Sequence, residues 1–222
     1  RTLCSLGMKR LNETPRTAFR EMLILAKRTF PVSLTDVVFT IAPRINAAGR
    51  LRSGKHAVEL MISEDLEEIQ TLAAEINEDN LERRTLDKGI TEDALEILKE
   101  YPENRSTNVV FKESWHKGVV GIVASRITEN HYKPTIVLTE SKGVITGSAR
   151  SVQDFDVHDA IVKCSDLLEQ FGGHKYAAGL TMKTENLDAF KVKFEEVVAE
   201  SIDPELLIPE QKVDIELSFD QI

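Results

Sequence analysis

The pattern of apolar residues changes at Asn104, and this change limits the fold more than any other feature of the sequence. Beyond it, short β-prone runs alternate with stretches whose apolar residues recur at helical spacing. The candidate strands are residues 108–111, 135–138, 144–150 and 178–182, and the candidate helices are residues 118–128, 157–168 and a stretch marked by Leu187, Phe190, Phe194 and Val197. Such alternation over roughly a hundred residues predicts a compact α/β domain.

Negative charge is concentrated just before that domain. Residues 64–104 contain 14 acidic and 4 basic side chains, a net charge of −10, whereas the whole 222-residue chain carries −9. Apolar residues recur at helical spacing through the same segment: Ile69, Leu72, Ala73, Ile76, Ile90, Ala94, Ile97 and Leu98. They predict one long helix, or two helices broken near Gly89, with Ser63 as N-cap and an end before Pro102. So much acid outside one narrow apolar stripe is typical of a solvated connector.

The two ends of the sequence predict further elements. Residues 1–28 are predicted helical, with Pro15 in an early turn and a break at Pro31, and another helix is predicted to start near His56. After a linker marked by Pro204 and Pro209, residues 213–218 alternate like the first strand of a truncated β domain. The chain starts without Met and ends inside this pattern, so we expect a piece of a longer protein.

Composition predicts a cytoplasmic protein. No apolar run approaches the roughly 20 residues of a membrane span, and no signal-peptide pattern opens the chain. The two cysteines, Cys4 and Cys164, form neither a disulfide framework nor a metal-ligand spacing. Because the acid is confined to one segment, the net charge does not exclude a nucleic-acid ligand.

Gly172-Gly173-His174 is the first candidate binding segment. Paired glycines let backbone N–H groups approach an anion, and a histidine beside them can donate a hydrogen bond or a proton to a phosphate oxygen. The segment is predicted to be a Gly-Gly turn before a strand. The alternative is a plain turn with a solvent-exposed histidine.

Residues 147–151, Gly-Ser-Ala-Arg-Ser, form the second candidate at the end of a predicted strand. The Arg150 guanidinium can clamp a phosphate with two hydrogen bonds, and the hydroxyls of Ser148 and Ser151 can complete the site. The alternative is a strand that runs into a turn and leaves Arg150 on the surface.

The third candidate is the polar run that contains Arg44, Asn46 and Arg50, which we expect to be flexible. Two arginines around an amide suit contacts along a phosphodiester backbone, without reading of the bases. A polar loop with no ligand is the alternative.

Two other segments are weaker candidates. Residues 154–159 contain three aspartates and a histidine, a composition that hard cations favour, but Asp156 is better explained as the N-cap of the following helix. Trp115-His116-Lys117-Gly118 precedes a predicted helix N-terminus that could take an anion, although a packing tryptophan is the commoner explanation. We therefore predict no metal site in this chain.

Taken in order, four segments carry a resemblance to a known family. They are IAPRINAAGRL at residues 41–51, WHKGVVGIVASR at 115–126, GSARS at 147–151 and GGH at 172–174. Together they resemble the RecJ exonucleases of the DHH phosphoesterase superfamily over nearly the whole chain. The resemblance assigns residues 1–59 to the end of a DHH lobe and its exit, 60–104 to a helical connector, 105–202 to a mixed-sheet DHHA1 substrate-binding domain, and 203–222 to a linker and the first strand of an OB-like domain.

The resemblance also implies an activity. RecJ-like enzymes degrade single-stranded DNA from the 5′ end in repair and recombination, with Mn²⁺ or Mg²⁺ in the DHH lobe, and a single-strand-binding protein or a helicase is a candidate partner. This sequence lacks Asp-His-His, so the chain alone is expected to be inactive. By position, Arg150 and His174 are expected to contact the phosphate and stabilise the transition state. The remaining substrate-binding residues implied are Arg44, Asn46, Arg50, Ser148, Ser151, Gly172 and Gly173.

Two alternative functions stay open at this point. One is another DHH-superfamily phosphodiesterase, acting on short oligonucleotides or cyclic dinucleotides. The other is a non-catalytic nucleic-acid-binding module, like the related domain appended to alanyl-tRNA synthetase. Nothing in the sequence resembles a recognition helix, so sequence-specific binding is not expected.

Overall fold

The computed structural model describes residues 1–210 and 213–218. The chain divides into two compact units, Arg1–Gly89 and Ile90–Ile222. The boundary lies inside one continuous helix, α6 (Leu66–Lys99), so the long helix is confirmed and the alternative break near Gly89 is not found. Asp65 is the N-cap of this helix, because it accepts a hydrogen bond from the backbone N–H of Glu68. The prediction of Ser63 as the N-cap was therefore wrong.

The first unit is helical. Its elements are α1 (Thr2–Glu13), α2 (Thr17–Leu25), α3 (Leu34–Asp36), a π-helical turn (Val37–Ile41), α4 (Ala42–Leu51), α5 (Gly54–Ile62) and the first part of α6. Its core includes Met22, Leu23, Ile41, Leu60 and Ile76. Residues 1–28 contain two helices. Pro15 lies in the break before α2 and not in the first turn of one long helix.

Residues 42–51 correct a prediction, because this polar run is helix α4 and not a flexible loop. Pro43 is the second residue after the π-helical turn Val37–Ile41, and Ala47 and Ala48 are buried. Arg52, which follows α4, forms an ion pair at 2.8 Å with the buried carboxylate of Asp79 on α6. Burial raises the pKa of Asp79, and the charge of Arg52 opposes that effect.

The second unit contains a five-stranded mixed sheet in the order β1-β2-β3-β5-β4. The strands are β1 (Asn108–Phe111), β2 (Thr135–Ser141), β3 (Val144–Arg150), β4 (Gln170–His174) and β5 (Ala177–Met182). Only β1 and β2 are parallel, and they are joined through α7 (Val120–His131). The predicted α/β domain with a mixed sheet is thus confirmed.

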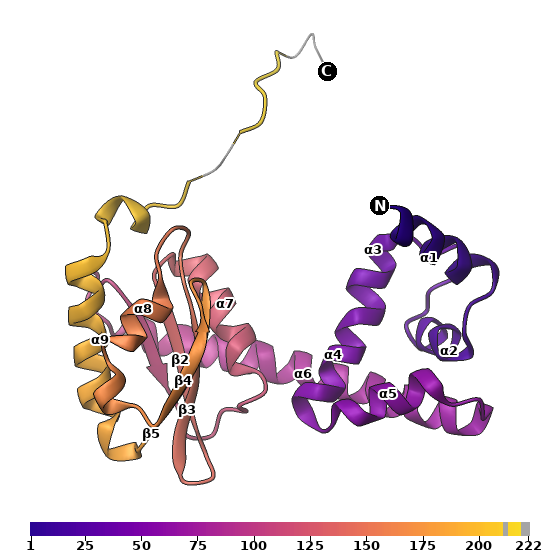
Figure 1. Cartoon of the computed structure of the whole chain (residues 1–222), viewed down its shortest axis with the longest axis horizontal. Helices are drawn as coiled ribbons and strands as arrows, with labels where there is room; N and C mark the ends of the chain where they lie inside the picture. The colour runs from indigo at the N-terminus through magenta and orange to yellow at the C-terminus, as the bar shows by residue number, and fades with distance from the viewer. Residues whose placement is uncertain (211–212, 219–222) are drawn as a thin grey trace. The chain divides into compact units, whose positions relative to one another are not determined.

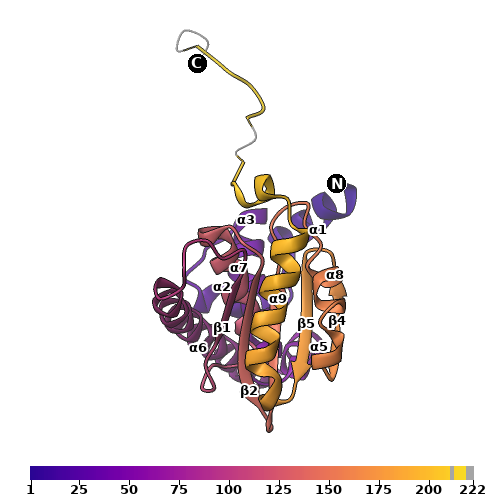
Figure 2. The same ribbon diagram turned by 90° about the vertical axis from the view of Figure 1, so that its left-hand side faces the viewer.

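Helices cover both faces of this sheet (Figures 1 and 2). On one face α8 (Val157–Val162) and α9 (Leu187–Ser201) contribute Ile161, Phe190 and Phe194 to the main core. On the other face α7 packs on β1, β2 and β3 and buries Val123 and Ile127. Helix α7 makes few or no contacts with β4 and β5, so this face of the β5–β4 hairpin is uncovered. It carries exposed glycines.

Two carboxylates fasten loops to the sheet domain. Glu195 of α9 accepts hydrogen bonds from the backbone N–H groups of Ser106 (2.6 Å) and Thr107 (3.1 Å). Asp93 of α6 accepts from Lys112 Nζ at 2.6 Å and from the indole of buried Trp115 at 3.2 Å. These two hydrogen bonds, the one from Lys112 first, hold the pKa of Asp93 below its usual range.

Residues 213–218 correct another prediction, because they are exposed and lack strand structure. A strand needs a partner for its backbone groups, and no described segment pairs with this one. The remainder of the expected strand, residues 219–222, and residues 211–212 of the linker lie outside the described part of the chain. After residue 203, the described secondary structure is one 3₁₀ helix, Pro204–Leu207.

Candidate functional site

Strand pairing brings two of the predicted residues to the same end of three neighbouring strands, β3, β5 and β4. Ala177 at the start of β5 pairs with Arg150 on one side and with His174 on the other. Directly paired residues of neighbouring strands point to the same face, so Arg150 and His174 share a face about 10 Å apart, two strand spacings. They lie 24 residues apart in the sequence and form one charged row.

Gly-Gly-His is the end of the exposed edge strand β4, so the prediction of a turn was wrong. The prediction failed because glycine is disfavoured in strands and marks turns locally. Here the pairing with β5 overrides that local preference. His174 is the last residue of the strand, and its side chain is exposed.

A second row lies next to the first on the same face and consists of Ser148, Gly179 and Gly172. A Cβ atom built on Gly172 meets nothing within 4 Å, and one on Gly179 meets only the Gly147 carbonyl oxygen at 3.9 Å. Two adjacent strands thus present a floor without side chains beside the Ser148 hydroxyl. A ligand can approach the backbone closely at such a floor.

The Arg150 guanidinium is held in place from several sides. Its Nε donates to Ser125 Oγ of α7 at 3.1 Å, and its Nη1 donates to the Ala149 carbonyl at 2.7 Å and to Ser148 Oγ at 3.3 Å. These bonds fix the direction of the side chain before any ligand binds. Preorganisation of this kind lowers the entropic cost of binding.

Two residues that shape this site, Gly121 and Ser125, were not among the candidates predicted from the sequence. A Cβ on Gly121 would lie 3.0 Å from Ser148 Oγ and 3.2 Å from Arg150 Nη2, so glycine lets α7 approach β3 this closely. Gly121 and Ser125 are four residues apart and face the same way on α7. That spacing was visible in the sequence, but the partner strand was not.

Gly173 and Ser151 have a different environment from their neighbours. Gly173 (φ +154°) pairs with Ala178 in the row that faces the other side of the sheet. The Ser151 hydroxyl donates to the Phe155 carbonyl at 2.9 Å, while its backbone N–H donates to the Tyr176 carbonyl at 3.1 Å. Both residues shape the backbone around Arg150 and His174.

The three candidate residues of the first unit lie on α4. Arg44 donates to Asn77 Oδ1 at 3.1 Å and to the Thr40 carbonyl at 2.8 Å, and burial lowers the pKa of its guanidinium. Asn46 and Arg50 are exposed and four residues apart, so they share one face of the helix. Arg44 thus supports the unit, whereas Asn46 and Arg50 present polar groups at its surface.

Among residues 1–210 and 213–218 no group of three or more His, Cys, Asp or Glu side chains is placed to hold a metal ion. In the aspartate-rich segment, Asp156 accepts a hydrogen bond from the backbone N–H of Asp159 at 3.0 Å. This confirms its predicted role as the N-cap of α8. Similarly, Trp115 is buried, as the packing explanation predicted.

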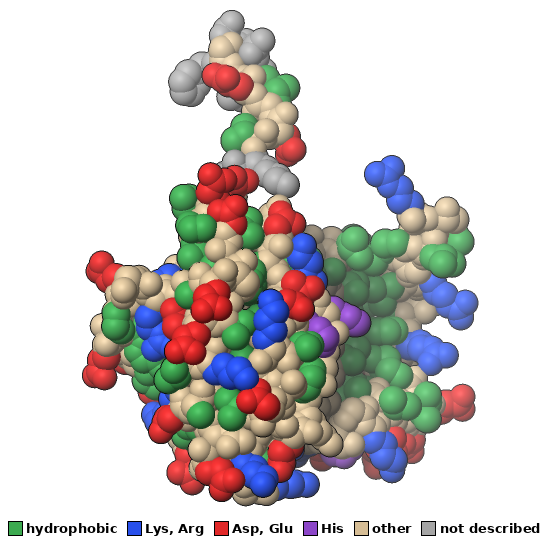
Figure 3. All heavy atoms as spheres, turned by 60° about the vertical axis from the view of Figure 1, so that its left-hand side comes forward, with side chains coloured by type: hydrophobic (Ala, Val, Ile, Leu, Met, Phe, Trp, Pro, Cys, Tyr) green, Lys and Arg blue, Asp and Glu red, His purple; other side chains and the backbone are tan. Residues whose placement is uncertain are grey.

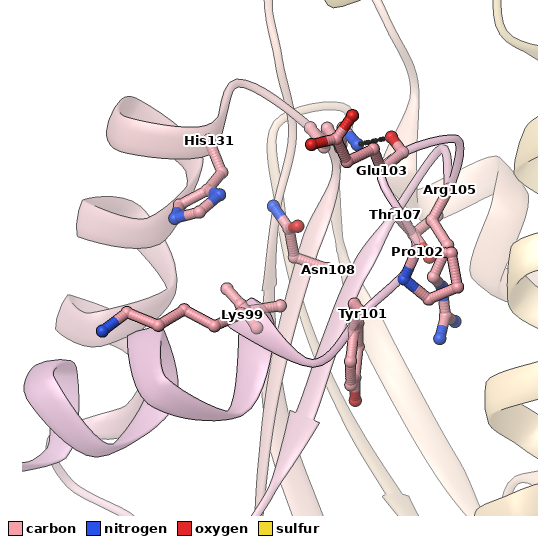
Figure 4. Close-up of a pocket in the computed structure, with 10 residues that line it drawn as sticks. Lys99, Tyr101, Pro102, Glu103, Arg105, Thr107, Asn108 and His131 are labelled. Atoms are coloured by element: carbon pink, nitrogen blue, oxygen red, sulfur yellow. Dashed lines mark hydrogen bonds between the residues drawn. The ribbon is translucent and has the colours of Figure 1, made fainter.

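A polar pocket of about 290 Å³ near the start of β1 is a second place to look for a ligand (Figure 4). Three of its cations are engaged within the protein: Lys99 with Glu96, Arg105 with Glu195, and Lys133 with the Glu103 carbonyl. Lys99 is the last residue of α6, where its positive charge is favourable beside the helix dipole, and His131 is the last residue of α7. These contacts explain the pocket's charge without a ligand, and we assign no function to it.

Charge on the second unit is mixed. Figure 3 shows acidic and basic side chains interspersed over its visible face. The face in this view is the one covered by α9, and no broad basic field is present there. None of the described helices is long and apolar enough to cross a membrane.

Comparisons with known proteins identify the family that this chain resembles. Residues 104–200 match the DHHA1 domain. The single-stranded-DNA-specific exonuclease RecJ of Bacillus subtilis (strain 168) is 37% identical over 225 residues, which cover 100% of this chain and 29% of that protein. The chain is similar to RecJ along its whole length. The family resemblance drawn from the four sequence segments is therefore confirmed.

Solved RecJ structures agree in fold. The structure of Thermus thermophilus RecJ in complex with Mg²⁺ matches with a TM-score of 0.78 and 33% identity, over 89% of this chain and 31% of that chain. An exonuclease RecJ bound to manganese matches with a TM-score of 0.79 and 31% identity, over 90% of this chain and 49% of that chain. The present chain thus spans half or less of the RecJ proteins it matches.

Proposed function

We propose that this chain is the substrate-binding portion of a single-stranded-DNA-specific exonuclease that hydrolyses phosphodiester bonds from the 5′ end, in DNA repair and recombination. The observation that carries the proposal is the charged row of Arg150 and His174 beside the Ser148 hydroxyl and the floor of Gly172 and Gly179. A cation, a hydroxyl and an unobstructed backbone are the groups that bind a phosphodiester.

Each group in the site has a separate task. Arg150, oriented by Ser125, directs its guanidinium at two phosphate oxygens, and Ser148 donates a further hydrogen bond. His174 donates to a phosphate oxygen from the other side of the row and stabilises the charge that develops during hydrolysis. In the first unit, Asn46 and Arg50 hold the sugar-phosphate backbone without reading bases.

The proposed reaction uses divalent metal ions, and we assign their ligands to residues other than those described. The matched RecJ structures are complexes with Mg²⁺ or manganese, whereas residues 1–210 and 213–218 contain no metal-binding cluster. We place the metal ligands in the part of the protein outside this chain. The chain alone is expected to bind DNA without hydrolysing it. A single-strand-binding protein or a helicase remains a family-based expectation for the partner.

Fluorescence anisotropy of a labelled single strand, with and without a 5′-phosphate and across a salt series, tests the proposal. Replacing Arg150 with alanine removes one charge-assisted contact, so we expect affinity for the 5′-phosphorylated strand to fall roughly 10- to 100-fold. The salt slope should also decrease by about 0.7. Ser125→Ala should give a smaller loss, because it keeps the guanidinium and removes only one of its supports.

The matched control is Arg20→Ala, which removes an exposed arginine from α2. It should leave both the affinity and the preference for a 5′-phosphate unchanged. If Arg150→Ala and Arg20→Ala bound DNA with the same affinity as the unmodified chain, the phosphate site would not be at Arg150.

A further inference from the structure

A shallow trough of about 370 Å³ lies next to the charged row, over β3, β5 and β4. Its floor includes Gly172 and Gly179, at which an added Cβ would meet no side chain within 4 Å. Beyond them a third cross-strand row follows, in which Thr181 pairs with Thr146 and with Gln170. Residues two apart along a strand point to the same face, so this row shares the face of Arg150.

The three rows lie in order along the strands. A strand advances about 3.4 Å per residue, so the row of Thr146, Thr181 and Gln170 lies about 14 Å from the row of Arg150 and His174. The glycine row lies midway between them. The face thus changes from charged, through open backbone, to neutral and polar over about 14 Å.

The chemistry of the third row differs from that of a phosphate site. Within the part of the chain that the structure describes, the residues lining the trough carry no charged side chain. Gln170 is exposed, and the Thr146 and Thr181 side chains are half-buried. An amide and hydroxyls offer hydrogen bonds to uncharged groups, such as the edge of a base or the oxygen of a sugar.

We infer that this trough binds the nucleoside attached to the phosphate held by Arg150. The base lies flat on the floor of Gly172 and Gly179, and its edge accepts or donates hydrogen bonds at Gln170 and Thr181. The inference rests on the proposed function, because it takes the phosphate position at Arg150 as its starting point. Both the amide of Gln170 and a hydroxyl donate and accept, so the subsite suits any of the bases and does not select sequence.

The test uses the full-length protein that carries this chain, with a chelator to prevent hydrolysis. One ligand is a 5′-phosphorylated oligonucleotide, and the other is the same strand with an abasic first nucleotide. Anisotropy competition gives the ratio of the two affinities for each protein variant. We expect the unmodified protein to prefer the strand with the base roughly 3- to 10-fold, the worth of one hydrogen bond or slightly more.

The combined variant Gln170→Ala, Thr181→Val removes the polar groups and keeps the strands. The ratio should fall to about 1, while affinity for the abasic strand stays unchanged. The control Gln70→Ala removes an exposed glutamine from α6 of the first unit and should keep the original ratio.

Three results would overturn the inference. They are a ratio of 1 in the unmodified protein, an unchanged ratio in the combined variant, or an equal loss of affinity for both strands in that variant. An equal loss would mean that the effect does not depend on the base, as when another part of the protein covers this face. Arg150→Ala separates the two claims. If this variant loses the preference for a 5′-phosphate while the combined variant keeps the original ratio of affinities, the proposed function stands and the subsite is refuted.

Discussion

Adjacent glycines in β4 should respond to substitution in opposite ways. Gly172 and Gly173 differ in backbone and surroundings: a Cβ on Gly172 meets nothing within 4 Å, whereas one on Gly173 would lie 2.3 Å from the Ala177 carbonyl oxygen and 2.5 Å from Ala178 Cα. Gly173 also has a φ of +154°, a conformation that L side chains rarely adopt. Alanine at position 172 should therefore fit, and alanine at position 173 should not.

The magnitudes follow from these contacts. Gly172→Ala reduces the freedom of the unfolded chain and adds no clash, so it should stabilise the second unit by about 0.5 kcal/mol. Gly173→Ala adds backbone strain and an overlap that only a shift of β4 away from β5 can relieve. Each of these effects costs about 1–3 kcal/mol, so the total destabilisation should be about 3 kcal/mol or more.

The sole tryptophan of the chain, Trp115, is buried in the second unit, so its emission during urea unfolding reports the stability of that unit. Gly172→Ala should keep or raise the unfolding midpoint and still weaken binding of single-stranded DNA, because its methyl group enters the ligand floor. Gly173→Ala should lower the midpoint. Equal midpoints for the two variants would refute the edge-strand geometry, and unchanged DNA affinity in Gly172→Ala would refute the open floor.

Three further predictions concern the second unit. Glu195→Ala leaves two backbone donors without their carboxylate and should lower the free energy of unfolding by about 1–3 kcal/mol in the same urea assay. Because the pKa of Asp93 is lowered, its contribution to stability is complete above its ordinary pKa of 3.8 and is lost as the pH falls through the folded-state value. An acid titration followed by Trp115 emission should show this loss, and Asp93→Asn should remove it. Burial raises the pKa of Cys164 to about 11, so at pH 8 a thiol reagent should modify exposed Cys4 alone, and both cysteines only after unfolding.

Local patterns predicted most of the sheet domain. The alternation of β3, residues 144–150, predicted its bounds directly, and the helical spacing from Leu187 predicted α9. These elements bury one face against the core, so their sequences carry the matching period. Strand β4 has no such period, since its residues are all exposed, and its pairing with β5 is a tertiary contact that composition does not encode.

The sequence predicted candidate binding residues but not how they lie together, and their role in binding stays a prediction. Arg150 and His174 were identified by chemistry, whereas their common position across Ala177 depends on strand order. Ser125 was missed as a support of Arg150 because a serine inside a helix resembles an ordinary surface residue until the neighbouring strand is known. The polar run of residues 42–50 was expected to be flexible, although its alanines are compatible with the helix that forms there, α4.

The period of two in the strands explains why small residues alternate with functional ones in both motifs. In β3, Ser148 and Arg150 face the ligand side, while Gly147 and Ala149 face the core, where a Cβ on Gly147 would lie 2.4 Å from Leu138. In β4, Gly172 and His174 face the ligand side, and Gly173 faces Ala178. In each motif, residues that we propose to bind the ligand alternate with residues that pack closely. Substitutions at Gly147 and Gly173 should therefore impair folding, whereas those at Ser148, Gly172 and His174 should impair binding and leave the fold intact.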